Sequence, residues 1–195
     1  MTPTIAEEHM TAAEFLKKYG HCSGVELVRG KVVWAGQEEP NSTGGLRMPE
    51  FKHGVICVRA AGVIQDFIKP LDLGWVAIND TYVTVDSEKG TVRGADVLYV
   101  SYKRLPKGPI PDDLPVAPEL VIEVRSPSDR LNRLSAKATE YLNAGVIVVV
   151  VLDPVSESAA VFRLDEFPQR FSNGDELTLP DVLPGFSVPV RTFFE

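Results

Sequence analysis

Hydrophobic and polar positions near the start of the chain predict a helix followed by a hairpin. Thr11 and Glu14 form the capping-box pattern S/T-x-x-E, which predicts a short amphipathic helix through about residue 19. The segment VELVRGKVVW (25–34) predicts two strands that turn at their central Arg-Gly pair. The polar, glycine-rich stretch 36–45 predicts a mobile loop, which would act as a lid or as a simple connection.

The middle of the chain predicts a long helix and then several strands. The helix is expected from about Pro49 to Lys69, where Pro70 stops it. Its hydrophobic residues recur at helical spacing: Phe51, Val55, Val58, Ile64 and Phe67. WVAIN, TYVTV and TVRGADVLYVS then predict two or three strands, and the proline-rich segment 102–118 predicts a loop.

The segment 119–153 predicts a strand, a helix and a second strand. ELVIEVR is strongly β-prone, and a helix of about 130–144 follows, with Gly145 as its C-cap. The hydrophobic side of this helix comprises Leu131, Leu134, Ala138, Tyr141 and Leu142. GVIVVVVLD has no polar alternation, which is typical of a strand covered on both faces. A right-handed crossover and short C-terminal strands complete one predicted α/β domain over 1–195, a mixed sheet flanked by helices with an N-terminal helix and hairpin.

Composition narrows the class of protein. Hydrophobic residues make up 44% of the chain and charged residues 24%, which excludes disorder, collagen and a small disulfide scaffold. With 27 acidic against 20 basic residues and a net charge of −7, non-specific coating of nucleic acid is disfavoured, although a local basic cleft stays open.

No targeting or membrane segment is expected. The first ten residues, MTPTIAEEHM, lack the basic segment followed by a hydrophobic segment that marks a secretory signal peptide. The hydrophobic run 146–152 is far too short to span a bilayer. We therefore predict a cytoplasmic protein with no membrane partner. Neither Cys22 nor Cys57 is expected to belong to a zinc site or a disulfide.

The candidate chemistry centres on two carboxylates. Glu123 interrupts an otherwise hydrophobic strand, where a carboxylate is costly unless a cation, a metal or a proton balances it. Arg125 shares its face, and a structural Glu–Arg pair is one interpretation. Asp96 lies at the start of the hydrophobic part of a second predicted strand. If the two strands are neighbours, the two carboxylates can lie close together, and such a pair suits Mg²⁺. Two unrelated surface acids are the alternative.

Several segments together resemble a known family. VELVRGKVV, GADVLYVS, PELVIEVRSPSDRLNRLSAKATEYLNAGV, VVVLDP and LPGF occur in the order found in the Uma-type family of putative restriction endonucleases, within the PD-(D/E)XK nuclease superfamily. The resemblance implies a restriction-endonuclease-like core and a phosphodiesterase centre that uses Mg²⁺ or Mn²⁺.

The resemblance also implies roles for individual residues. Asp96 takes the first acidic position and Glu123 the second, and the backbone carbonyl of Val124 adds a metal ligand. Arg125 stands where the superfamily has lysine, so it can supply a fixed charge but not a general base. Lys137 is a candidate to replace that lysine.

Further residues have both a functional and a structural interpretation. Arg130, Arg133 and Lys137 are spaced as a stripe that would bind a phosphate backbone, or they form an ordinary solvated helix face. His53, where the family also has histidine, would orient water or phosphate, or is a satisfied half-buried side chain. Glu26 is an accessory acid or an exposed residue at the hairpin edge.

These observations lead to one main function and two alternatives. The first is a metal-dependent endonuclease acting on DNA, expected by resemblance to be a homodimer. A catalytically silent nuclease-fold binding or scaffold module is the rival, favoured by Arg125 and the acidic charge. A small-molecule hydrolase is the third.

Overall fold

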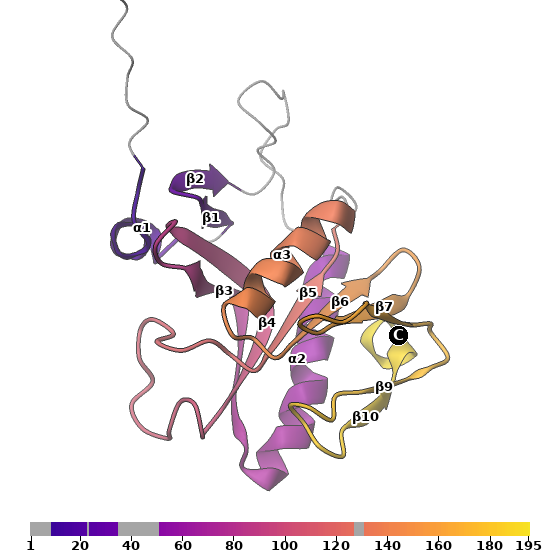
Figure 1. Cartoon of the computed structure of the whole chain (residues 1–195). Helices are drawn as coiled ribbons and strands as arrows, with labels where there is room; N and C mark the ends of the chain where they lie inside the picture. Colours follow the sequence, from indigo (N-terminus) through magenta and orange to yellow (C-terminus); the bar gives the residue numbers. More distant parts are fainter. Residues whose placement is uncertain (1–8, 23, 35–50, 127–130) are drawn as a thin grey trace, which may run out of the picture.

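Three helices surround a mixed β-sheet in this computed structural model, which describes residues 9–22, 24–34, 51–126 and 131–195 (Figure 1). The helices are α1 (Ala12–Tyr19), α2 (Phe51–Leu71) and α3 (Leu131–Asn143), with a short 3-10 helix at Val190–Phe193. The predicted loop 36–45 and the predicted helix start at Pro49 lie outside the described residues.

One eight-stranded sheet forms the centre of the fold. Its strands are β1 (Val25–Val28), β2 (Lys31–Trp34), β3 (Gly74–Asp86), β4 (Thr91–Ser101), β5 (Leu120–Val124), β6 (Val148–Asp153), β7 (Ser158–Phe162) and β8 (Gln169–Phe171). The order is β2-β1-β4-β5-β6-β7-β8, with β3 paired to β4. Two further strands, β9 (Glu176–Thr178) and β10 (Ser187–Pro189), pair with each other.

The sheet is mixed because β5 and β6 are parallel, while the other strand pairs are antiparallel. Helix α3 makes the crossover between these two strands. Gly145 follows α3 with φ +98°, a conformation that favours glycine. The fold class, the N-terminal helix with its capping box, and the hairpin are all confirmed.

The two faces of the sheet are covered by different helices (Figure 1). In β5, Ile122 and Val124 belong to the hydrophobic cluster under α2, whereas Val121 belongs to the cluster under α3. Successive side chains of a strand point to opposite faces, so Glu123 faces α3. This placement decides which side chains can reach its carboxylate.

The hydrophobic face predicted for the long helix is wrong in part. Helix α2 buries Ile56, Ala60, Ile64 and Ile68, which repeat every four residues. Phe51 and Val58 are 88% and 62% exposed. Helical spacing alone does not decide which of these hydrophobic residues face the core. Helix α2 ends at Leu71, so Pro70 lies in its last turn.

The chain does not turn between WVAIN and TYVTV. Both segments belong to β3, whose register against β4 shifts between Ile78 and Thr81. Asn79 and Asp80 have φ of 71° and 55°, so the boundary between these two segments is an irregularity within one strand. A Cβ on Gly94 would lie 3.1 Å from the Cβ of Asp80, so the glycine gives this irregularity room.

One edge of β4 is divided between two neighbours, and this division creates the site. Strand β3 pairs along one edge of β4, and β1 and β5 share the other. Leu27 of β1 pairs with Val92, whereas pairing with β5 begins at Val97 opposite Ile122. Residues 93–96 of β4 therefore lie where β1 has separated and β5 has not yet joined.

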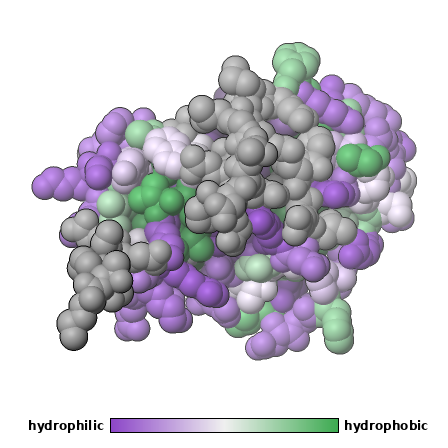
Figure 2. All heavy atoms as spheres, turned by 90° about the horizontal axis from the view of Figure 1, so that it is seen from above, coloured by the Kyte–Doolittle hydropathy of each residue, from purple (hydrophilic) through white to green (hydrophobic). Residues whose placement is uncertain are grey.

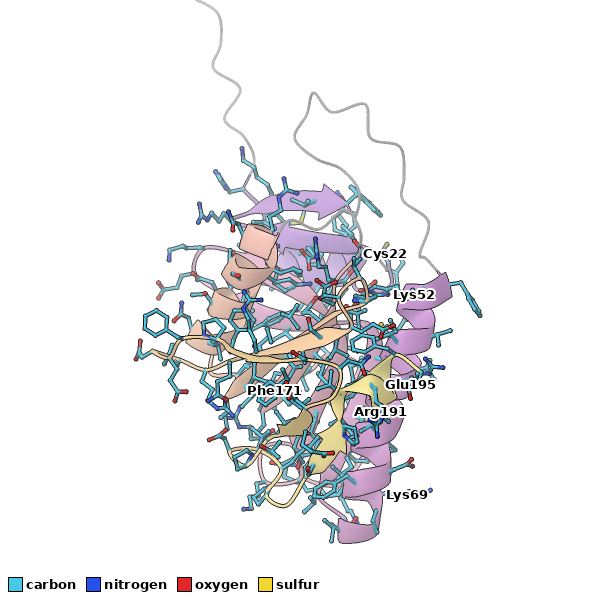
Figure 3. All side chains as sticks on the ribbon, turned by 90° about the vertical axis from the view of Figure 1, so that its right-hand side faces the viewer. Cys22, Lys52, Lys69, Phe171, Arg191 and Glu195 are labelled. Atoms are coloured by element: carbon cyan, nitrogen blue, oxygen red, sulfur yellow. The ribbon has the colours of Figure 1, made fainter. Side chains whose placement is uncertain are left out.

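The C-terminal segment packs beside α2. Figure 3 shows Lys52 and Lys69 toward opposite ends of this helix, with Arg191 and Glu195 alongside it. Within the described residues, no helix is long and hydrophobic enough to cross a membrane. Viewed from above, hydrophilic residues cover much of the described surface, with hydrophobic residues in small patches (Figure 2).

Candidate active site

The ammonium group of Lys137 lies in the gap between β1 and β5. Its Nζ donates to the carbonyl oxygen of Gly94 at 2.8 Å and to Glu123 Oε2 at 2.9 Å, and it lies 3.1 Å from Glu26 Oε1. A lysine ammonium has three N–H donors, and each has an acceptor here. Lys137 therefore links α3 to β1, β4 and β5.

Glu26 joins this lysine to a second cation. Its Oε2 lies 2.8 Å from Arg93 NH1, and the Gly94 N–H donates to its Oε1 at 3.1 Å. Arg93 also contacts Glu140 of α3, with NH2 at 2.7 Å from Oε2. The side chain of Glu26 is 25% exposed, so it is neither a free edge residue nor fully buried.

Tyr141 closes the inner side of the site. Its hydroxyl lies 3.0 Å from both the Gly94 carbonyl oxygen and Glu123 Oε1. One hydroxyl proton cannot serve both acceptors fully at once. A protonated Glu123 would donate to the hydroxyl oxygen and leave the hydroxyl free to donate to Gly94.

Burial and charge shift the ionisation of these groups. Burial raises the pKa of Glu123 to about 8, against the opposing effect of Lys137, and Asp96 raises it further. Burial also opposes ionisation of Glu26, but Lys137 and Arg93 outweigh it and hold its pKa below the ordinary value. Burial would lower the pKa of Lys137, yet Glu123 and Glu26 raise it well above normal. Lys137 is thus a fixed cation rather than a base.

Asp96 lies on the side of the site nearer α2. Its Oδ2 accepts the Val124 N–H at 2.7 Å and lies 3.3 Å from His53 Nε2. His53 Nε2 also donates to the Val124 carbonyl oxygen at 3.0 Å. Its other ring nitrogen, Nδ1, lies 3.5 Å from the sulfur of Cys57. The hydrogen bond to Asp96 is the largest cause that raises the pKa of His53.

The oxygen donors fit a hard divalent cation. Asp96 precedes Val97, the first residue of β4 that pairs with β5, and it accepts the N–H of Val124, the residue after Glu123. The two carboxylates and the Val124 carbonyl are the ligand types that Mg²⁺ takes alongside water. Glu123 would exchange a contact with Lys137 or Tyr141 to join such a site.

The remaining predicted residues lie farther from this centre. Arg125 NH1 contacts Asp153 Oδ2 at 2.7 Å, beyond the end of β5. Arg133 is exposed, whereas Lys137 points inward and is 18% exposed, so these two do not form one solvated stripe. Arg130 lies outside the described residues. The phosphate-binding roles of Arg130 and Arg133 stay predictions.

Several neighbours of the site were not singled out from the sequence. Tyr141 was predicted only as a hydrophobic helix residue, although its spacing of four from Lys137 places both on one side of α3. The same spacing separates His53 from Cys57. Asp80 accepts the Gly24 N–H at 3.3 Å, and burial together with Asp96 raises its pKa.

The chain is similar to a known protein family and to a solved structure. Residues 45–191 match the model of the Uma2 family, described as "Putative restriction endonuclease". A crystal structure of a putative nuclease belonging to DUF820, from Anabaena variabilis ATCC 29413, superposes with a TM-score of 0.79 and 20% identity. The alignment covers 95% of this chain and 97% of that one, which supports the same fold. No curated protein matches the chain.

The lysine at the centre should matter for stability. Lys137→Met leaves Glu123 and Glu26 without their shared cation, so the free energy of unfolding should fall by about 3 kcal/mol. Urea unfolding measures this change. Lys89→Met is the matched control because Lys89 is 75% exposed, and it should change stability little. Equal losses in both variants would contradict the assigned role of Lys137.

The raised pKa of Glu123 predicts a pH dependence. Its folded pKa of about 8 lies above the ordinary 4.5, so folding favours its protonated form. Its contribution to stability is full below about 4.5 and is lost as the pH rises toward about 8. The wild type should therefore lose stability relative to Glu123→Gln over this range. Urea unfolding across the pH series tests this. A free energy of unfolding of the wild type, minus that of Glu123→Gln, that stays constant or rises with pH would be inconsistent with it.

Proposed function

Since the chain belongs to the Uma2 family of putative restriction endonucleases, we propose that it is a metal-dependent endonuclease that hydrolyses phosphodiester bonds in DNA. The observation that carries the proposal is the pair of acids in the middle of β4 and near the end of β5, next to a largely buried lysine. Asp96 and Glu123 belong to adjacent strands, and Lys137 contacts Glu123 at 2.9 Å.

The cation in this proposal is Mg²⁺ or Mn²⁺. Asp96, Glu123 and the carbonyl oxygen of Val124 would hold it. When bound, such an ion lowers the pKa of its water and neutralises charge on the scissile phosphate. The Val124 N–H orients Asp96 through a hydrogen bond of 2.7 Å.

The chain's own cations have separate roles in this proposal. Lys137 keeps its charge, so it stabilises negative charge that develops on the phosphate, and Glu26 holds it in place. Arg125 supplies a second positive charge near the end of β5. Arg133 is exposed on α3 and would contact the phosphate backbone. His53 would orient a water or a phosphate oxygen near Asp96.

The partners follow from the proposed reaction. DNA is the expected substrate, and a homodimer would supply two sites for cutting both strands. The cytoplasmic location stays a prediction.

A catalytically silent nuclease-fold module is the second candidate, and one observation favours it. All three N–H donors of Lys137 have protein acceptors, and both oxygens of Glu123 have protein partners. In a silent protein this network would be purely structural. The two candidates therefore differ in whether Glu123 releases its partners to bind an ion.

Nicking of supercoiled plasmid distinguishes the two functions. The wild type should nick plasmid with Mg²⁺ or Mn²⁺ and stop when EDTA is added. Glu123→Gln should reduce the rate at least about a hundredfold, because the ion loses a charged ligand. Glu88→Gln, on the exposed turn between β3 and β4, is the matched control and should keep full activity.

Two results would count against an active enzyme. Unchanged nicking by Glu123→Gln would place the activity elsewhere or in a contaminant. Absence of nicking by the wild type, together with no Mg²⁺ or Mn²⁺ binding in calorimetry, would support the silent module.

A further inference from the structure

A second set of donor atoms lies beside the proposed magnesium ligands. A ring nitrogen of His53, the sulfur of Cys57 and a carboxylate oxygen of Asp96 lie within 4.8 Å of one another. Among the described residues, this is the one group of three or more such donors that meets this distance criterion. It combines nitrogen, sulfur and oxygen, unlike the oxygen-only set formed by Asp96, Glu123 and Val124.

The distance between His53 and Cys57 matches the separation of two ligands on one tetrahedral ion. Ligands at about 2.3 Å for sulfur and about 2.0 Å for nitrogen lie about 3.5 Å apart around a tetrahedral zinc. The distance from His53 Nδ1 to Cys57 Sγ is 3.5 Å. One turn of α2 separates the two residues, so the helix itself sets this spacing.

The other ring nitrogen of His53 is already oriented. Nε2 donates to the Val124 carbonyl oxygen at 3.0 Å. Metal-binding histidines usually donate their second ring N–H to such a group, which fixes the tautomer. Here that hydrogen bond leaves Nδ1 facing the sulfur of Cys57. Asp96 Oδ2 lies 3.3 Å from the same Nε2, so it would turn from this nitrogen toward the ion to become a ligand.

The group is also reachable from solvent. The side chains of His53 and Asp96 are 24% and 13% exposed, and Cys57 is half-buried and free of any disulfide. Three protein ligands would leave a fourth position for water, as in open tetrahedral sites.

We propose that His53, Cys57 and Asp96 form a binding site for a thiophilic divalent cation of the zinc class. Thiolate and imidazole ligands favour Zn²⁺ or Co²⁺, whereas Mg²⁺ takes oxygen ligands and keeps its water. The proposed site differs from the expectation, drawn from the sequence, that Cys57 belongs to no zinc site. It shares Asp96 with the proposed endonuclease centre but does not require that centre to be active.

Cobalt spectroscopy of the whole protein under reducing conditions tests the proposal. Co²⁺ should give the visible bands of a tetrahedral ion and a near-ultraviolet charge-transfer band that requires a thiolate ligand. Excess Zn²⁺ should remove these bands by displacement, and excess Mg²⁺ should not. In Cys57→Ser the charge-transfer band should disappear, and the Kd for Zn²⁺ should rise at least about tenfold.

Matched variants show whether the charge-transfer band arises at this group of residues. Cys22→Ser changes the chain's other cysteine, which lies outside the group, and should keep the band. His53→Gln should weaken Zn²⁺ binding as Cys57→Ser does, and it serves as the second variant if Cys57→Ser fails to fold. Glu123→Gln should keep the band even though it should slow nicking, so the two proposals can fail independently.

Three results would overturn the proposal. The first is the absence of a thiolate-to-cobalt band in the wild type. The second is a band of equal intensity in Cys57→Ser, and the third is loss of the band in Cys22→Ser with retention in Cys57→Ser.

Discussion

The ion pairs of Lys137 hold together the part of the fold where the sheet divides. Strands β1 and β5 leave residues 93–96 of β4 between them, so the backbone groups that face this gap need partners other than a strand. Lys137 and Tyr141 donate to the Gly94 carbonyl, and Glu26 accepts its N–H. The N-terminal hairpin therefore belongs to the site, because it supplies Glu26.

The same contacts set the chemistry that the site can perform. A buried carboxylate with a raised pKa, such as Glu123, holds its proton more strongly than a surface acid does. A divalent cation would have to displace that proton and one of the partners of Glu123. Lys137 stays charged throughout, so the proposed site can neutralise a phosphate but lacks a lysine base. Glu123 therefore has both a structural role, as the partner of Lys137 and Tyr141, and a proposed role as a metal ligand.

The sequence predicted the fold more completely than the site. The capping box, the hairpin, strand β4 and the β5–α3–β6 crossover follow from local patterns and are confirmed. The proximity of Asp96 and Glu123 depended on which strands are neighbours, which local patterns do not state, and β4 and β5 are neighbours in the sheet. The spacing of residues along α3 could not predict that the Lys137 side chain points inward, because this orientation depends on the gap in the sheet between β1 and β5. The buried face of α2 likewise depended on packing.

Diffraction from crystals soaked in Mn²⁺ tests the central claim most directly. The account predicts an anomalous peak within about 2.3 Å of oxygen atoms from both Asp96 and Glu123 and next to the Val124 carbonyl, with Lys137 still paired to Glu26. If Glu123 keeps its contacts with Lys137 and Tyr141 at a saturating Mn²⁺ concentration, and no ion contacts its carboxylate, this claim is contradicted.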